Sequence, residues 1–206
     1  MTDRKKLLEE YKHKKDDIKK RLHEFEKIGK GSAEDIFTEL CFCILTPQSN
    51  ARWCDKAIQE LKKKRLLFKA PVGAIRPVLK GRSRFHNKKA EYLVNARRSF
   101  DRSILSSGNI FDVRKKIVDN IKGVGYKEAS HFLRNIGMGS DIAILDRHIL
   151  KNLKRHGVIK GVPLSMSVKS YLNIEDRARA FAKKMGIGLE ELDLLFWSRE
   201  TGEIFK

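Results

Sequence analysis

The chain has 206 residues, 41% of them hydrophobic, and its 45 Lys and Arg residues outnumber its 26 Asp and Glu residues, which gives a formal net charge of +19. This positive charge exceeds what solubility requires and indicates a polyanionic partner. The alternative, a highly charged thermophilic surface, explains why charged residues are abundant but not why positive ones predominate. The chain has no run of about 18 apolar residues, so we expect one globular domain or two small ones, and no membrane span.

The spacing of apolar residues predicts helices along almost the whole chain and no strand of convincing length. The first is a long helix whose apolar positions share one face: Leu8, Tyr11, Ile18, Leu22 and Phe25. Ser32, as an N-cap with Asp35 at N3, begins a second helix, which Thr46 and Pro47 end. Further helices are predicted at 50–64, 87–100, 111–121, 127–136, 147–155, 168–185 and 189–199, with loops at 81–86 and 157–167. The predicted fold is all-α.

The cysteines and the N-terminus bear on the cell compartment. Cys41, Cys43 and Cys54 all lie in the N-terminal part of the chain, and the first two fall in an apolar helix. Buried free thiols are therefore expected, and not a disulfide or a metal site. The first residues lack the apolar segment of a secretory signal, which favours a cytoplasmic protein.

The most informative segment is the turn between the helices predicted at 111–121 and 127–136, which makes a helix-hairpin-helix. It reads Lys122-Gly123-Val124-Gly125-Tyr126. Gly123 and Gly125 can adopt positive φ and have no Cβ, so the turn can approach another surface closely. The free N–H groups at the start of the second helix suit a phosphate. An ordinary αα turn that ends in a C-cap glycine gives the same pattern.

Two residues near the turn have the chemistry of a catalytic pair. Lys127 falls in the first turn of the second hairpin helix, where the positive end of the macrodipole favours a neutral, nucleophilic amine. Asp146 precedes the helix at 147–155 as an N-cap, and the same dipole keeps its carboxylate ionised. This carboxylate could activate the amine or stabilise a cationic sugar. The alternatives are a lysine that only contacts phosphate and a plain helix cap.

These residues resemble the helix-hairpin-helix DNA glycosylase superfamily, in which the hairpin lysine attacks C1′ of a flipped nucleotide. Within it, the chain is similar to the compact archaeal-type 8-oxoguanine DNA glycosylase/AP lyases at 39–46, 84–91, 123–137, 145–148, 191–197, Thr201-Gly202 and Lys206. No cysteine follows Cys54, so the four ligands of the iron–sulfur cluster in endonuclease III and the adenine mismatch glycosylases are missing. The resemblance implies no metal or organic cofactor, and at most a monovalent cation at the hairpin.

The resemblance also implies a mechanism and a domain organisation. A bifunctional DNA repair enzyme would flip 8-oxoguanine out of double-stranded DNA, excise it through a Schiff base on Lys127 with help from Asp146, and cut the strand by β-elimination. Residues 33–136 would form a central helical barrel that includes the helix-hairpin-helix at 111–136. Residues 1–32 and 137–206 would form a second helical subdomain, with an active-site cleft between the two. A monomer is sufficient to enclose a base.

Further site residues come from the resemblance. It places the aromatic pair that sandwiches the base at Phe85 and Trp197, for which core packing is the alternative. The terminal carboxylate of Lys206 would accept the proton that oxidised guanine carries on N7. Asp193 would read the donor edge of the base, unless it is a plain surface charge.

Two groups of residues would hold the duplex. The hairpin residues Lys122, Gly123, Val124, Gly125 and Tyr126 would bind the DNA backbone. Gln48 would fill the hole left by the flipped base, although its segment, residues 46–50, departs from the Thr-Ala-Asn common in the family, and Ser49 and Asn50 stay open as alternatives.

Two other functions fit the same residues. A glycosylase of this fold for another oxidised base, such as an oxidised pyrimidine, would use the same catalytic pair. A non-catalytic helix-hairpin-helix module would bind DNA, but it would leave Asp146 and the aromatic residues of the base pocket unexplained.

Overall fold

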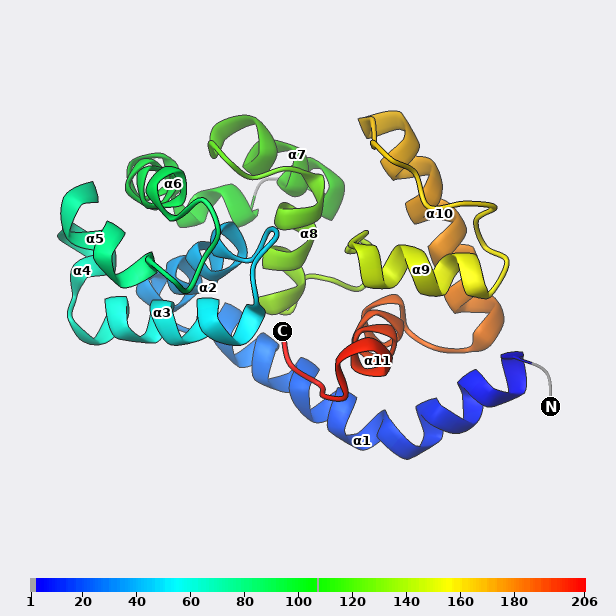
Figure 1. The fold of residues 1–206 in the computed structure, drawn as a ribbon. Helices are drawn as coiled ribbons and strands as arrows, with labels where there is room; N and C mark the ends of the chain where they lie inside the picture. Colours follow the sequence, from blue (N-terminus) through cyan, green and yellow to red (C-terminus); the bar gives the residue numbers. More distant parts are fainter. Residues whose placement is uncertain (1–2, 107) are drawn as a thin grey trace. The chain divides into compact units, whose positions relative to one another are not determined.

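The computed structural model describes residues 3–106 and 108–206, and within these ranges the regular structure is entirely helical (Figure 1). The predicted all-α fold is confirmed. No helix in the described ranges has the length and apolar character needed to cross a membrane. The helices are α1 (Asp3–Gly29), α2 (Ala33–Leu45), α3 (Ala51–Lys63), α4 (Leu66–Lys69), α5 (Val72–Leu79), α6 (His86–Ser99), the 3₁₀ helix η1 (Arg102–Ser106), α7 (Ile110–Asn120), α8 (Tyr126–Asn135), α9 (Arg147–Arg155), α10 (Val168–Met185) and α11 (Leu189–Thr201).

The long amphipathic helices lie where the apolar spacing predicts them. The segments 147–155 and 168–185 coincide with α9 and α10, and the other predicted ends are shifted by a residue or two. Sequence analysis missed α4, α5 and η1. The first and last of these are too short to show a helical period, and α5 contains Pro77, which is unfavourable inside a helix.

Side-chain caps explain where several helices begin. Ser32 accepts a hydrogen bond from the backbone N–H of Asp35, and the Asp35 carboxylate accepts one from the backbone N–H of Ser32, so the predicted capping box of α2 is confirmed. Hydrogen bonds from Lys62 and then Ser32 lower the pKa of Asp35 to about 2. The same helix ends at Leu45, directly before Thr46 and Pro47, as predicted.

The chain divides into two compact units, one formed by Ile28–Phe132 and the other by Met1–Lys27 with Leu133–Lys206. The boundaries fall inside α1 and α8. Sequence analysis drew its subdomains at 33–136 and at 1–32 with 137–206. The assignment of separate roles to these subdomains, with a cleft between them, stays a prediction.

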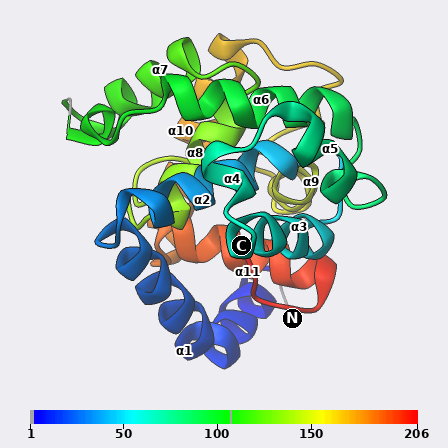
Figure 2. The same ribbon diagram turned by 90° about the vertical axis from the view of Figure 1, so that its left-hand side faces the viewer.

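The core of the unit Ile28–Phe132 is α2, which packs against α3 and α6 (Figures 1 and 2). Every residue from Ile36 to Leu45 is buried, as expected for a helix surrounded on all sides by others. Phe37, Phe100 and Phe132 form a chain of ring contacts in this core, with centroids 6.2 and 5.8 Å apart. The three cysteines lie in the same core as buried free thiols, as predicted.

The unit formed by residues 1–27 and 133–206 contains α1, α9, α10 and α11. Helix α11 packs against α9 and α10, and most of its residues from Leu189 to Phe196 are buried. Tyr11 of α1 donates a hydrogen bond to Glu191 of α11 over 2.9 Å. Burial, reinforced by that bond, raises the pKa of Tyr11 to about 12. The hydrogen bond therefore persists across the physiological pH range.

Candidate active site

The hairpin between α7 and α8 requires glycine at one of its two glycine positions. Gly123 has φ +89°, and a Cβ built on it would lie 2.4 Å from the ring of Tyr92 in α6. Gly125 does not have positive φ, so only Gly123 uses the conformational freedom that the sequence predicts for both. Val124 is buried, and its contact with DNA stays a prediction. The turn therefore rests directly on α6.

We expect Gly123→Ala to destabilise the protein far more than Gly81→Ala, which is a matched control. Both positions have positive φ, which disfavours alanine by about 1 to 2 kcal/mol, but nothing lies within 4 Å of a Cβ on Gly81. At Gly123 the overlap with Tyr92 adds about 1 to 3 kcal/mol and displaces the turn. Urea unfolding and duplex binding measure both effects. Equal losses in the two variants would contradict this account of the hairpin.

The N-terminus of α8 already holds an anion, which is the carboxylate of Glu128. Its Oε2 accepts a hydrogen bond from the backbone N–H of Gly125 over 3.2 Å, and its Oε1 lies 3.2 Å from Nζ of Lys127. The sequence predicted a phosphate at this N-terminus, and the bond from Gly125 to Glu128 was not predicted. A glutamate at N3 that reaches back to the N-cap is a known capping signal and could have revealed it.

Lys127 lies in the first turn of α8, as predicted, since the helix begins at Tyr126. Its side chain is 24% exposed, so the amine is partly sheltered but still accessible. The amine must leave Glu128, or pass a proton to it, before it can act as a nucleophile. The preceding residue, Tyr126, has its ring centroid 5.0 Å from the guanidinium of Arg114. Lys122, the other lysine of the hairpin, is exposed.

Asp146 caps α9, as predicted. Its Oδ1 accepts hydrogen bonds from the backbone N–H groups of His148 and Ile149, both over 2.8 Å. Its Oδ2 receives no hydrogen bond from the residues that the structure describes. The two cap bonds leave the other carboxylate oxygen for another partner.

Helix α10 holds the extended segment that leads to Asp146. Tyr171 donates a hydrogen bond to the carbonyl of Ala143 over 2.6 Å and accepts one from the N–H of Leu145 over 3.4 Å. The buried carboxylate of Glu175 accepts a hydrogen bond from the N–H of Ala143 over 2.7 Å. These bonds satisfy the backbone of a buried segment that has no secondary structure of its own.

Gln48 and Phe85 share an unusual backbone conformation. Among the described residues, the non-glycine positions with positive φ are Gln48 (+55°), Arg65 (+59°) and Phe85 (+56°). The Phe85 side chain is 58% exposed, so the alternative that it packs in the core is wrong. A left-handed backbone conformation is strained at a bulky residue, and residues in this conformation are concentrated at functional sites.

The neighbours of Gln48 have other tasks. Ser49 accepts a hydrogen bond from the backbone N–H of Arg84 over 2.9 Å, and Asn50 caps α3 through the N–H of Trp53. Gln48 is exposed. The side chains of both alternatives are engaged within the protein, and the role of Gln48 in filling the gap left by the flipped base stays a prediction.

The C-terminal tail is tied to α1. Arg21 donates a hydrogen bond to the carbonyl of Phe205 over 2.8 Å, and its guanidinium lies 5.7 Å from the ring centroid of the same residue. Phe205 is buried and packs 6.3 Å from Trp197, which is itself half-buried. The half-buried Lys206 follows directly, so its position depends on this anchor.

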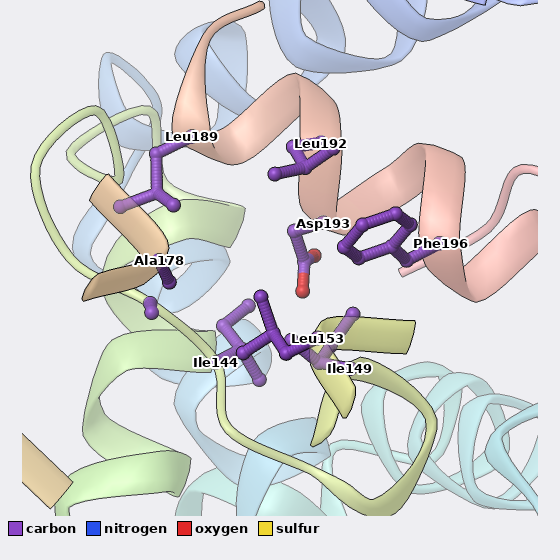
Figure 3. A pocket seen from close by; sticks show the side chains of 9 residues that line it. Ile144, Ile149, Leu153, Ala178, Leu189, Leu192, Asp193 and Phe196 are labelled. Atoms are coloured by element: carbon purple, nitrogen blue, oxygen red, sulfur yellow. The ribbon is translucent and has the colours of Figure 1, made fainter. Parts of the chain in front are cut away.

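Asp193 is buried, so the alternative that it is a surface charge is wrong. Its carboxylate lies 3.3 Å from Nη2 of Arg134 and points among the apolar side chains of Ile144, Leu153 and Phe196 (Figure 3). The cavity there measures about 10 Å³, roughly the space of one water molecule. A nucleobase does not fit in it, and the predicted contact between Asp193 and the base stays a prediction.

No group of His, Cys, Asp or Glu residues within 3–106 and 108–206 is arranged to hold a metal ion. A monovalent cation at the hairpin stays a prediction.

Two features on an all-α scaffold define the class of helix-hairpin-helix DNA glycosylases. One is a lysine in the first turn after a glycine hairpin, and the other is an aspartate that caps a later helix. The family model described as 8-oxoguanine DNA glycosylase matches residues 18–187. The 8-oxoguanine DNA glycosylase/AP lyase of Fusobacterium nucleatum is 43% identical over 95% of this chain and 94% of its own length. The chain belongs to the 8-oxoguanine DNA glycosylase family.

Solved structures agree with this assignment. The crystal structure of the Thermotoga maritima 8-oxoguanine DNA glycosylase is 36% identical, covers 98% of both chains and has a TM-score of 0.90. The Methanocaldococcus jannaschii 8-oxoguanine glycosylase/lyase, solved in complex with a 15mer DNA containing 8-oxoguanine, is 39% identical, covers 98% of both chains and has a TM-score of 0.89. The helix-hairpin-helix fold of this chain is that of the family.

Proposed function

We propose that this protein excises 8-oxoguanine from double-stranded DNA and then cleaves the strand as an AP lyase. The observation that carries the proposal is the amine of Lys127 in the first turn of α8, directly after the hairpin, in a chain that belongs to the 8-oxoguanine DNA glycosylase family. The net charge of +19 suits a DNA substrate. The related M. jannaschii enzyme has been solved with DNA that contains 8-oxoguanine.

The chemistry begins when the damaged nucleotide leaves the base stack. The neutral amine of Lys127 attacks C1′ as the bond from C1′ to N9 breaks, and the departing base takes up a proton. The carboxylate of Asp146 stabilises the positive charge that develops on the sugar. The C1′–O4′ bond then opens, O4′ gains a proton, and an iminium forms between Lys127 and C1′. Loss of a C2′ proton expels the 3′ phosphate and cuts the strand.

Recognition of the base is the finer part of the proposal. Phe85 and Trp197 sandwich the base, and the carboxylate of Lys206 accepts a hydrogen bond from the N7–H group that distinguishes 8-oxoguanine from guanine. The exposure of Phe85 and the anchoring of the tail by Arg21 support these roles. The enzyme works as a monomer, because one subunit is enough to enclose a base. It acts in the cytoplasm.

Borohydride trapping on duplexes with one defined lesion tests this function. We expect a covalent adduct between protein and DNA on the 8-oxoguanine duplex, because reduction converts the iminium on Lys127 to a stable amine. An undamaged guanine duplex is the control and gives no adduct. Trapping on thymine glycol without trapping on 8-oxoguanine would favour a glycosylase for oxidised pyrimidines. Binding without trapping on any duplex would favour a non-catalytic module.

A further inference from the structure

Lys89 of α6 is a buried lysine with no part in the proposed chemistry. Its residue exposure is 5%, and its Nζ lies within hydrogen-bonding distance of four acceptors: the carbonyls of Leu45 and Pro47, both at 2.7 Å, and the hydroxyls of Ser49 at 3.0 Å and Ser83 at 3.1 Å. An ammonium has three N–H groups, so these partners use all of them. Because the amine is enclosed by protein, it is not a DNA contact.

A charged side chain in this position is costly. Burial lowers the pKa of Lys89 to about 8, since desolvation disfavours the ammonium. The side chain is still mostly protonated at neutral pH. A buried charge commonly contributes less stability than an apolar residue of the same volume. A contribution to the stability of the fold therefore does not explain why residue 89 is a lysine and not an apolar residue.

The partners of Lys89 lie on either side of Gln48. Pro47 and Ser49 flank Gln48, and each accepts a hydrogen bond from Nζ of Lys89. The backbone N–H of Ser49 also bonds to the carbonyl of Thr46 over 2.9 Å, which closes the turn around Gln48. The loop that presents Gln48 is thus held from within by one ammonium group.

The same ammonium group holds the loop that presents Phe85. Its Nζ bonds to the hydroxyl of Ser83, two residues before Phe85, over 3.1 Å. The two loops are also joined directly, because the backbone N–H of Arg84 donates to the Ser49 hydroxyl. A positive φ at a non-glycine residue is strained and persists only where the surrounding structure over-determines it. Lys89 is the residue that both strained loops share.

We propose that Lys89 is a positioning residue that holds Gln48 and Phe85 in the conformations needed to fill the gap in the duplex and to stack on the flipped base. The inference rests on the proposed function, because it takes the roles of Gln48 and Phe85 from it. Lys89 acts through these two residues and touches neither the sugar nor the base.

The test compares Lys89→Met with the matched control Lys88→Met. Methionine has nearly the length of lysine without the charge, and Lys88 is the preceding residue, exposed and paired with Glu91. Two rates are measured on the same duplex sequence, namely release of 8-oxoguanine and cleavage at a preformed abasic site, which has no base to flip or stack. We expect Lys89→Met to slow base release by roughly 10-fold or more and abasic cleavage far less, because an abasic site offers Phe85 no base although it keeps a gap for Gln48. Lys88→Met should change neither rate.

Ser83→Ala provides a second, milder variant if Lys89→Met does not fold. It removes one partner of Nζ with a small change in volume, and we expect the same selective loss of base release at smaller amplitude. Parallel loss of both rates in a folded variant, or no loss of base release in either variant, would overturn the inference. A different result, in which the unmodified protein cleaves abasic DNA but releases no 8-oxoguanine, would contradict the proposed function itself.

Discussion

We expect replacement of Lys127 with Gln to eliminate base release and borohydride trapping, while the protein still folds and binds duplex DNA. The variant removes the nucleophile, so we expect the excision rate to fall by about 10³-fold or more. Glutamine favours helix almost as well as lysine and can still hydrogen-bond to Glu128. Because the Lys127 side chain is partly exposed, its loss changes the free energy of unfolding little. Single-turnover excision and trapping with 8-oxoguanine duplexes measure the effect.

Lys122→Gln is the matched control for Lys127→Gln. Lys122 is an exposed lysine in the same hairpin, five residues earlier. We expect this variant to bind duplex DNA more weakly, with a salt dependence reduced by about one phosphate contact, and to retain the chemistry at saturating protein. If Lys127→Gln instead behaved like Lys122→Gln and kept its excision rate, Lys127 would be a phosphate contact and the protein would lack lysine-based catalysis.

Asp146→Asn separates the chemical role of the carboxylate from its role as a helix cap. Asparagine caps helices about as well as aspartate, so the hydrogen bonds to the N–H groups of His148 and Ile149 persist and stability is retained. The negative charge near the developing cation is lost, and we expect excision to slow by roughly 10²-fold or more. Asp146→Ala loses the cap as well and should lower the free energy of unfolding by about 1 kcal/mol.

Urea unfolding and single-turnover excision on the two Asp146 variants distinguish these roles. The expected pattern is a slow but stable asparagine variant beside a slow and less stable alanine variant. An asparagine variant with full excision activity would show that Asp146 is a cap alone. The stabilisation of the sugar cation would then have to come from another residue.

Much of the site could be predicted because its signals are local. The position of Lys127 in the first turn of α8 and of Asp146 at the N-cap of α9 follows from apolar periodicity and capping preferences over a few residues. The same holds for the capping box of α2. The capping signal of Glu128, whose carboxylate pairs with Lys127, is equally local, so this contact was predictable although it was not predicted.

Other features could not be predicted because they depend on residues far apart in the chain. In the sequence, nothing distinguishes Lys89 from the many other basic residues. In the structure, its ammonium bonds to the carbonyls of Leu45 and Pro47, more than forty positions earlier. The ion pair between Asp193 and Arg134 spans a similar separation. The positive φ of Gln48 and Phe85 contradicts their intrinsic preferences, so no local rule would place them there.

The sequence by itself determined the long amphipathic helices, the hairpin, the catalytic candidates and the expectation of a polyanionic partner, because periodicity, caps and net charge act over short distances or add up along the whole chain. Only the tertiary structure decided which of these groups are free to act. It showed that Asp193 is buried beside Arg134 and that one buried lysine, Lys89, bonds to two strained loops. Burial and pairing of charges arise from packing between distant segments, and this is why they are not written in any single stretch of sequence.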